Sequence, residues 1–128
     1  MPTFPVVTGD VLTSTIFNGL PAFTVQTAKT VDYTAASGDE YQQLIPMNKA
    51  TAIAFKIPTD ATYNFPIGTV ITVLNIGVGA VTISAVTPGT TTILSAGGVA
   101  ASPTLAQYKS CAILKTAANV YYVVGSVA

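Results

Sequence analysis

The chain has 128 residues, which suits a single domain with a hydrophobic core of its own. Five acidic residues balance five basic ones, all of them Lys, so no cluster of positive charge is expected to bind nucleic acid or an anionic membrane. Charged residues make up only 8% of the chain, against about 25% in a typical soluble domain. A surface built instead from Thr, Ser, Asn, Gln, Gly and Ala has little electrostatic protection against association. Either partners cover much of that surface, or hydration of its hydroxyl groups keeps the chain in solution.

The first 30 residues are the least regular part of the sequence. Three prolines interrupt them, and no long hydrophobic pattern runs through the segment. We predict an extended arm with one helical turn, which Asp10 caps and Gly19 ends. The arm is too apolar for a free tail, so its hydrophobic side chains should pack on a neighbouring subunit or on their own domain. These side chains are Phe4, Val6, Val7, Ile16 and Phe17.

β-Branched and aromatic residues dominate the remainder of the chain and favour strands almost throughout. For residues 31–128 we expect one all-β domain, a β-sandwich or jelly-roll-like fold of about eight short strands. The expected strands are 22–27, 41–47, 51–57, 68–76, 80–86, 91–94, 107–117 and 120–127.

Glycines and small polar residues mark the turns between these strands. Gly77 and Gly79 permit positive φ angles, so strands 68–76 and 80–86 are predicted to form a hairpin. Both faces of 68–76 carry apolar side chains, which indicates burial on both sides, within the fold or against another subunit.

The last two expected strands form a second hairpin, with Ala118 and Asn119 at its turn. Because Tyr121 and Tyr122 are adjacent in a strand, they point to opposite faces. One tyrosine should therefore lie in the core and the other at the surface or in an interface.

The sequence lacks the residue sets on which catalysis is usually built. It has no His and one Cys, which excludes the usual zinc ligands, Ser-His-Asp and Cys-His arrangements, and an intrachain disulfide. Cys111 lies in the apolar stretch YKSCAILK and is expected to be a buried, inert thiol. The glycine-bearing segments match neither a Walker loop nor the GxGxxG pattern. We expect no enzyme activity, no cofactor and no metal.

The acidic residues fit turns better than a shared site. Asp39 and Glu40 are adjacent, and neighbouring side chains of a strand point apart, so a solvated turn is favoured over a calcium or glycosidase site. Asp60, in PTDATYNFP, is expected to hydrogen-bond its own loop backbone. The tyrosines could stack on sugar rings, but the absence of Trp and of a local acid cluster favours core or interface positions.

No segment has the length and apolar character of a transmembrane helix, and the start, MPTFPVVTGD, lacks the basic and apolar regions of a secretory signal. The chain is therefore expected to fold in the cytoplasm in which it is made, with no membrane partner.

Several short motifs follow one another between residues 40 and 128: FPIGTVITVLNIGVGAVTI, then YKSCAILK, then a turn with Asn and the aromatic end VYYVVGSV. In this order they resemble a β-domain of tailed-bacteriophage virion proteins. That domain occurs in head decoration or cement proteins and in tail and head fibres, often as a trimer. Many relatives end their last hairpin with a Trp, whereas this chain has Tyr121 and Tyr122, and many carry the domain at the end of a long fibre.

The resemblance implies a non-enzymatic virion protein, made in the host cytoplasm. The short chain and its apolar arm favour a capsid decoration or cement protein on the capsid surface, which would assemble as a homotrimer. Its partners would be the major capsid protein or other virion subunits, contacted through the arm. The alternative is a tail or fibre module that binds a host-surface receptor or carbohydrate through a loop containing Asp60, Tyr63 and Asn64.

Overall fold

The computed structural model describes residues 23–95 and 102–127, and every helix or strand within these ranges is a β-strand. The predicted all-β class is confirmed. The ten strands of the described residues are β1 (Thr24–Val25), β2 (Tyr33–Thr34), β3 (Gln43–Met47), β4 (Ile53–Ile57), β5 (Val70–Asn75), β6 (Val81–Ala85), β7 (Thr92–Ser95), β8 (Thr104–Leu105), β9 (Ser110–Ala117) and β10 (Val120–Gly125).

Each of the expected strands is present with somewhat shorter bounds, and β2 and β8 were not expected. Both have two residues, too few for an alternating pattern to be visible in the sequence. Strand β1 pairs with β3, and Lys29 forms an isolated bridge with Met47. The paired part of the chain therefore already includes residues 24–29, ahead of the expected domain boundary at residue 31.

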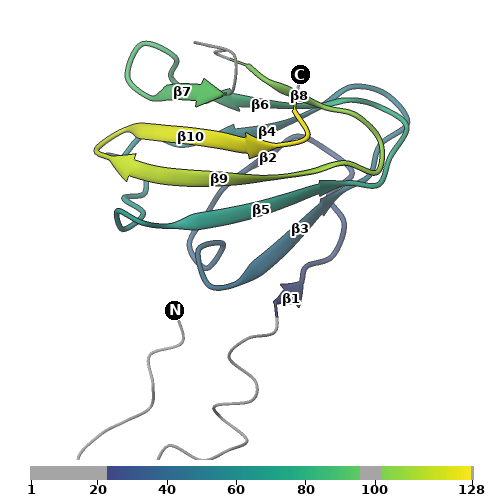
Figure 1. The fold of residues 1–128 in the computed structure, drawn as a ribbon, viewed down its shortest axis with the longest axis horizontal. Helices are drawn as coiled ribbons and strands as arrows, with labels where there is room; N and C mark the ends of the chain where they lie inside the picture. The colour runs from purple at the N-terminus through teal and green to yellow at the C-terminus, as the bar shows by residue number, and fades with distance from the viewer. Residues whose placement is uncertain (1–22, 96–101, 128) are drawn as a thin grey trace, which may run out of the picture.

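The strands form two sheets, one in front of the other in Figure 1. The larger sheet has the order β1-β3-β5-β9-β10-β7, and the smaller sheet has the order β2-β4-β6-β8. Successive strands alternate between the sheets from β1 to β9, and only the β9–β10 connection stays within one sheet. The chain therefore winds from sheet to sheet, which makes β1, β3 and β5 parallel neighbours, and likewise β2, β4 and β6. A jelly roll is built from antiparallel strands, so the jelly-roll alternative does not fit these pairings.

One turn of this winding has the same length in both sheets. Residue 44 pairs with residue 72 in the larger sheet, and residue 53 pairs with residue 81 in the smaller, an offset of 28 residues in each case. We call this the 28-residue winding.

Alternate side chains from both sheets meet in one hydrophobic core. In β4, for example, Ile53, Phe55 and Ile57 are buried, whereas Ala54 and Lys56 are partly exposed. Burial of apolar area contributes about 25 cal/mol per Å² and is the main favourable term in folding. The buried hydrophobic residues are Ala35, Ile45, Met47, Ile53, Phe55, Ile57, Phe65, Ile71, Val73, Val81, Ile83, Ile93, Leu105, Cys111, Ile113, Tyr121 and Val123.

The predicted hairpin of strands 68–76 and 80–86 is wrong. Strands β5 and β6 lie in different sheets, and the segment between them turns a corner from one sheet to the other. Neither Gly77 nor Gly79 has a positive φ angle. Both glycines are required for close approach instead, because a Cβ atom at Gly77 would overlap the backbone of Lys49, and one at Gly79 would overlap the backbone of Thr51. The corner between β5 and β6 thus stacks directly on the corner between β3 and β4.

Asn75 stabilises this corner from inside the core. Its side chain is fully buried, accepts a hydrogen bond from the Gly77 N–H at 2.9 Å, and donates to the carbonyls of Gly79 and Leu105, both at 2.9 Å. The backbone groups that the corner withdraws from the ladder are satisfied in this way.

The hairpin turned at Ala118 and Asn119 is confirmed, because β9 and β10 are antiparallel neighbours. Tyr121 is buried and Tyr122 is 42% exposed, so the expected division between the two tyrosines also holds. Cys111 is buried as predicted, and this burial raises the pKa of its thiol to about 12.

Candidate functional site

Two features of the described residues could support a function: the outer surface of the larger sheet and a buried lysine at one end of the fold. The outer surface is considered first. In β5 the side chains of Ile71 and Val73 point into the core, so those of Val70, Thr72 and Leu74 point away from it. We call the side chains that point away from the core on this sheet the outer face. They are Leu44, Pro46, Val70, Thr72, Leu74, Thr92, Leu94, Ser110, Ala112, Leu114, Thr116, Tyr122 and Val124.

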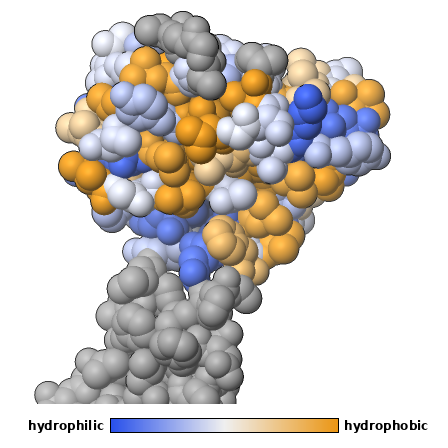
Figure 2. All heavy atoms as spheres, viewed as in Figure 1, coloured by the Kyte–Doolittle hydropathy of each residue, from blue (hydrophilic) through white to orange (hydrophobic). Residues whose placement is uncertain are grey.

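The outer face contains no charged residue, and its apolar members form rows across the strands. Val70 pairs with Leu114, Leu114 with Tyr122, and Tyr122 with Leu94. Val70, Tyr122 and Val124 are each more than two fifths exposed. Figure 2, which is viewed onto this sheet, has hydrophobic residues spread across the surface with pale, weakly polar residues between them. A second row consists of Leu44, Thr72, Ala112 and Val124.

The opposite surface, formed by the smaller sheet, is polar. Its outward side chains are mostly hydroxyl-bearing and include one charge, that of Lys56. The two surfaces of the fold therefore differ in kind, because one is apolar and uncharged while the other is hydrophilic. The outward residues of the smaller sheet are Thr34, Ala54, Lys56, Thr82, Ser84 and Thr104.

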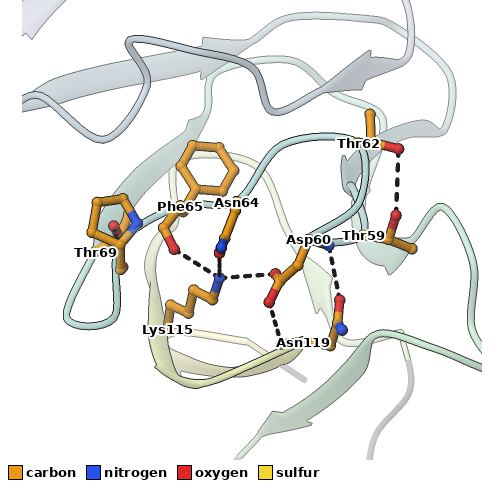
Figure 3. Close-up of polar contacts among 9 residues, drawn as sticks. Thr59, Asp60, Thr62, Asn64, Phe65, Thr69, Lys115 and Asn119 are labelled. Atoms are coloured by element: carbon orange, nitrogen blue, oxygen red, sulfur yellow. Dashed lines mark hydrogen bonds and ion pairs between the residues drawn. The ribbon is translucent and has the colours of Figure 1, made fainter.

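The second feature is Lys115 on β9, whose side chain is 1% exposed. Cys111, Ile113 and Lys115 alternate along the inward side of this strand, so the lysine occupies a core position. Its Nζ donates three hydrogen bonds: to Asp60 Oδ1 at 2.8 Å, to Asn64 Oδ1 at 2.8 Å and to the Phe65 carbonyl at 2.7 Å (Figure 3). All three protons of the ammonium group are thus satisfied.

Asp60 is held on its other side by the turn of the last hairpin. Its Oδ2 accepts the Asn119 N–H at 3.1 Å, and its own N–H donates to Asn119 Oδ1 at 2.9 Å. The expectation that Asp60 bonds its own loop is therefore wrong, since its partners lie on β9 and in the β9–β10 turn. The negative charge of Asp60 also acts on Tyr121, whose pKa is raised to about 12, mainly by burial and then by this charge.

A cavity of about 310 Å³ adjoins Lys115. Its lining is contributed by the loop ahead of β5 and by the end of β9: Asp60, Asn64, Phe65, Pro66, Ile67, Lys115 and Ala118. The ion pair therefore lies at the border between the core and an open hollow.

The structure brings together the three residues of the expected receptor loop, but gives each an internal partner. Tyr63 packs edge-on against Phe65 at 4.6 Å between ring centroids and donates its hydroxyl hydrogen bond to Glu40. This hydrogen bond is the main reason that the pKa of Tyr63 is raised. Asp60 and Asn64 both accept from Lys115. The expected arm residues Phe4, Val6, Val7, Ile16 and Phe17 lie outside the described residues.

The expectation of a solvated turn at Asp39 and Glu40 is wrong for Asp39, which is 3% exposed. Its carboxylate accepts hydrogen bonds from the Tyr33 hydroxyl at 2.7 Å, from Gln26 Nε2 at 2.8 Å and from the Ala36 N–H at 2.8 Å. Burial, followed by this hydrogen bond, raises the pKa of Tyr33. Asp39 and Glu40 therefore bond different tyrosines and do not converge on one point.

Lys115 was missed by the reasoning from sequence. The signal was present, because a lysine at an inward position of SCAILKTA breaks the apolar alternation of that strand. Its acceptors Asp60 and Asn64 lie more than 50 residues earlier in the chain, and local patterns cannot supply such partners.

Among the described residues, no group of three or more His, Cys, Asp and Glu side chains is placed to hold a metal ion. The same ranges contain no helix with the length and apolarity needed to cross a membrane. Comparisons with protein-family models, with curated proteins and with solved structures found no match. The fold and these two features therefore carry the functional argument alone.

Proposed function

We propose that this chain is a non-enzymatic structural protein of a tailed-phage virion, a β-sandwich that decorates the head shell as a homotrimer. The observation that carries the proposal is the uncharged, apolar outer face of the larger sheet. The low charge of the whole chain and the resemblance of residues 40–128 to virion β-domains support it. In this proposal the outer face packs against other subunits of the trimer, and the arm contacts the major capsid protein.

The outer face suits association because its desolvation would leave no charge unpaired. Burial of about 1,000 Å² of such surface per subunit would contribute roughly 25 kcal/mol before the costs of association are subtracted. Val70, Tyr122 and Val124, which are partly exposed in the single chain, would supply the centre of that interface.

The interface is tested by a charge placed at its centre. Tyr122→Lys should convert the trimer to monomer in sedimentation equilibrium, because a buried unpaired ammonium group costs several kcal/mol. Thr82→Lys is the matched control, since it introduces the same side chain on the outward side of β6. A Tyr122→Lys variant that remains trimeric would contradict the assignment of this face.

The capsid contact is tested by deletion of residues 1–20. The truncated protein should keep its β-domain, as judged by circular dichroism, and lose binding to shells that lack the decoration protein. Normal decoration by the truncated protein would show that the arm is not the contact.

A second function, recognition of a host-surface carbohydrate by a tail or fibre module, is favoured by one observation. The cavity beside Asp60 and Asn64 offers polar groups next to the exposed side chain of Ile67. Binding on a glycan array that is lost in Asn64→Ala and kept in Asn48→Ala would support this function. Cryo-electron microscopy of the virion separates the two proposals, because density at symmetric sites over the shell fits decoration and density at the tail or a fibre tip fits recognition.

A further inference from the structure

We propose that Lys115 and Asn64 become joined by an intramolecular isopeptide bond, with Asp60 as the acid–base catalyst of the reaction. The proposal rests on the contacts around Lys115 and does not depend on the virion function proposed above. It assigns a covalent modification to a cluster that would otherwise be only a buried ion pair.

The reacting groups are already in contact. Lys115 Nζ lies 2.8 Å from Asn64 Oδ1, and this oxygen is bonded to Cγ, the carbon that the amine would attack. The same Nζ lies 2.8 Å from Asp60 Oδ1, which is placed to accept its proton. An amine and a carbonyl held at this distance by a folded chain have a large effective concentration for reaction. Figure 3 shows the three side chains converging on the lysine nitrogen.

The surroundings favour aminolysis over a passive contact. Lys115 is 1% exposed, so its nitrogen is shielded from water, and a desolvated amine is the usual form of a nucleophilic lysine. The Phe65 carbonyl, at 2.7 Å from Nζ, fixes the nitrogen from a third direction. Asn119 is a positioning residue, because its backbone N–H and side-chain oxygen hold Asp60 in place.

The reaction balances without an oxidant or a co-reactant. Asp60 takes a proton from the Lys115 ammonium group, and the neutral amine attacks Asn64 Cγ to form the new Nζ–Cγ bond. Asp60 then relays a proton from Nζ to Asn64 Nδ2, the Cγ–Nδ2 bond breaks, and the nitrogen leaves as ammonia. The ammonia carries away the remaining proton as ammonium, and Asp60 returns to its carboxylate form. The cavity next to Asn64 provides the exit.

The test is the intact mass of the purified full-length chain, measured under denaturing conditions so that only covalent bonds count. The expected mass is lower than that of the sequence by one molecule of ammonia, after allowance for removal of the first Met. Tandem mass spectrometry of a protease digest should find a branched peptide in which Lys115 is joined to Asn64. A chain with the full mass of its sequence would overturn the proposal.

Variants assign the loss to these residues. Lys115→Met and Asn64→Ala should both restore the full mass, and Asp60→Asn should retain the ammonia while circular dichroism still reports a folded β-domain. Asn48→Ala, at an exposed asparagine in the corner after β3, is the matched control and should still lose ammonia. Loss of ammonia that persists in Asn64→Ala, or that maps to another residue, would also overturn the proposal.

Discussion

Lys115 is the residue at which the chain departs furthest from a simple apolar core. A charged side chain in a core position is tolerated only when its hydrogen bonds are complete and an opposite charge is close. Three acceptors match its three protons, and Asp60 supplies the charge. The cluster also connects β9 to the loop that precedes β5, so it fixes the end of the fold at which these segments meet.

Removal of the opposite charge should therefore be costly. We expect Asp60→Ala to lower the free energy of unfolding by about 3 kcal/mol, because the Lys115 ammonium would remain buried without its counter-charge. Urea denaturation measures the effect. Asp32→Ala is the control, since it removes an exposed hydrogen bond to the Ala54 N–H and should cost about 1 kcal/mol or less. Equal costs for the two variants would mean that burial of the lysine is unimportant.

Tyr121 presents the reverse case, a buried polar group without a partner. Its hydroxyl makes no hydrogen bond among the described residues. Replacement by Phe removes the unsatisfied group and keeps the ring, so Tyr121→Phe should leave stability unchanged or raise it by about 1 kcal/mol.

The same substitution should change the alkaline limit of stability. The pKa of Tyr121 is raised from 10.0 to about 12 in the folded chain, so the unfolded chain releases this proton first as the pH rises. The contribution of Tyr121 to stability is complete below pH 10 and is lost between pH 10 and about 12. Urea midpoints measured across this window should fall less steeply in Tyr121→Phe than in the parent chain. Parallel curves would contradict the assignment.

At the scale of elements, the stacked corners are the least replaceable part of the fold. A Cβ at Gly79 would overlap the backbone of Thr51, and backbone atoms cannot move aside as a flexible side chain can. Gly79→Ala should therefore cost about 3 kcal/mol or prevent folding. Gly89→Ala is the matched control, because a Cβ there meets no atom within 4 Å and the φ angle is not positive. That variant should stay within about 0.5 kcal/mol of the parent chain in thermal or urea unfolding.

The elements themselves could be predicted from the sequence, whereas their connections could not. Alternation in β4 and in β9 depends on local residue types, which the sequence displays directly. Glycines between two strands are equally compatible with a hairpin and with a corner, and only the stacking on Lys49 and Thr51 distinguishes them. That contact is made one turn of the winding earlier in the chain.

The candidate sites divide in the same way. The apolar outer face follows from the two-sided character of strand 68–76, which the sequence displays. The partners of Asp39, Asp60 and Lys115 are brought together by the fold and have no local signature. An isolated Asp in a loop therefore reads as a turn residue until its distant partner is known.

At the scale of the whole molecule, the fold has one apolar outer surface and one polar outer surface. Association through the apolar outer face should be insensitive to ionic strength, because salt screens interactions between charges and the face has none. The sedimentation coefficient of the oligomer should therefore be the same at low salt and at about 1 M NaCl. Dissociation at high salt would point to an interface that includes the few charged side chains instead.

The 28-residue winding also limits how a chain of this kind can change in length. Removal or insertion of one residue within a strand would shift its register and exchange core and solvent sides for every later residue of that strand. A whole turn is different, because its two strands would stack on the turn before with the same offset and the same corner contacts. The wound part of this domain can therefore lengthen by duplication of a complete turn, which makes the turn, and not the single residue or the single strand, its natural unit of growth.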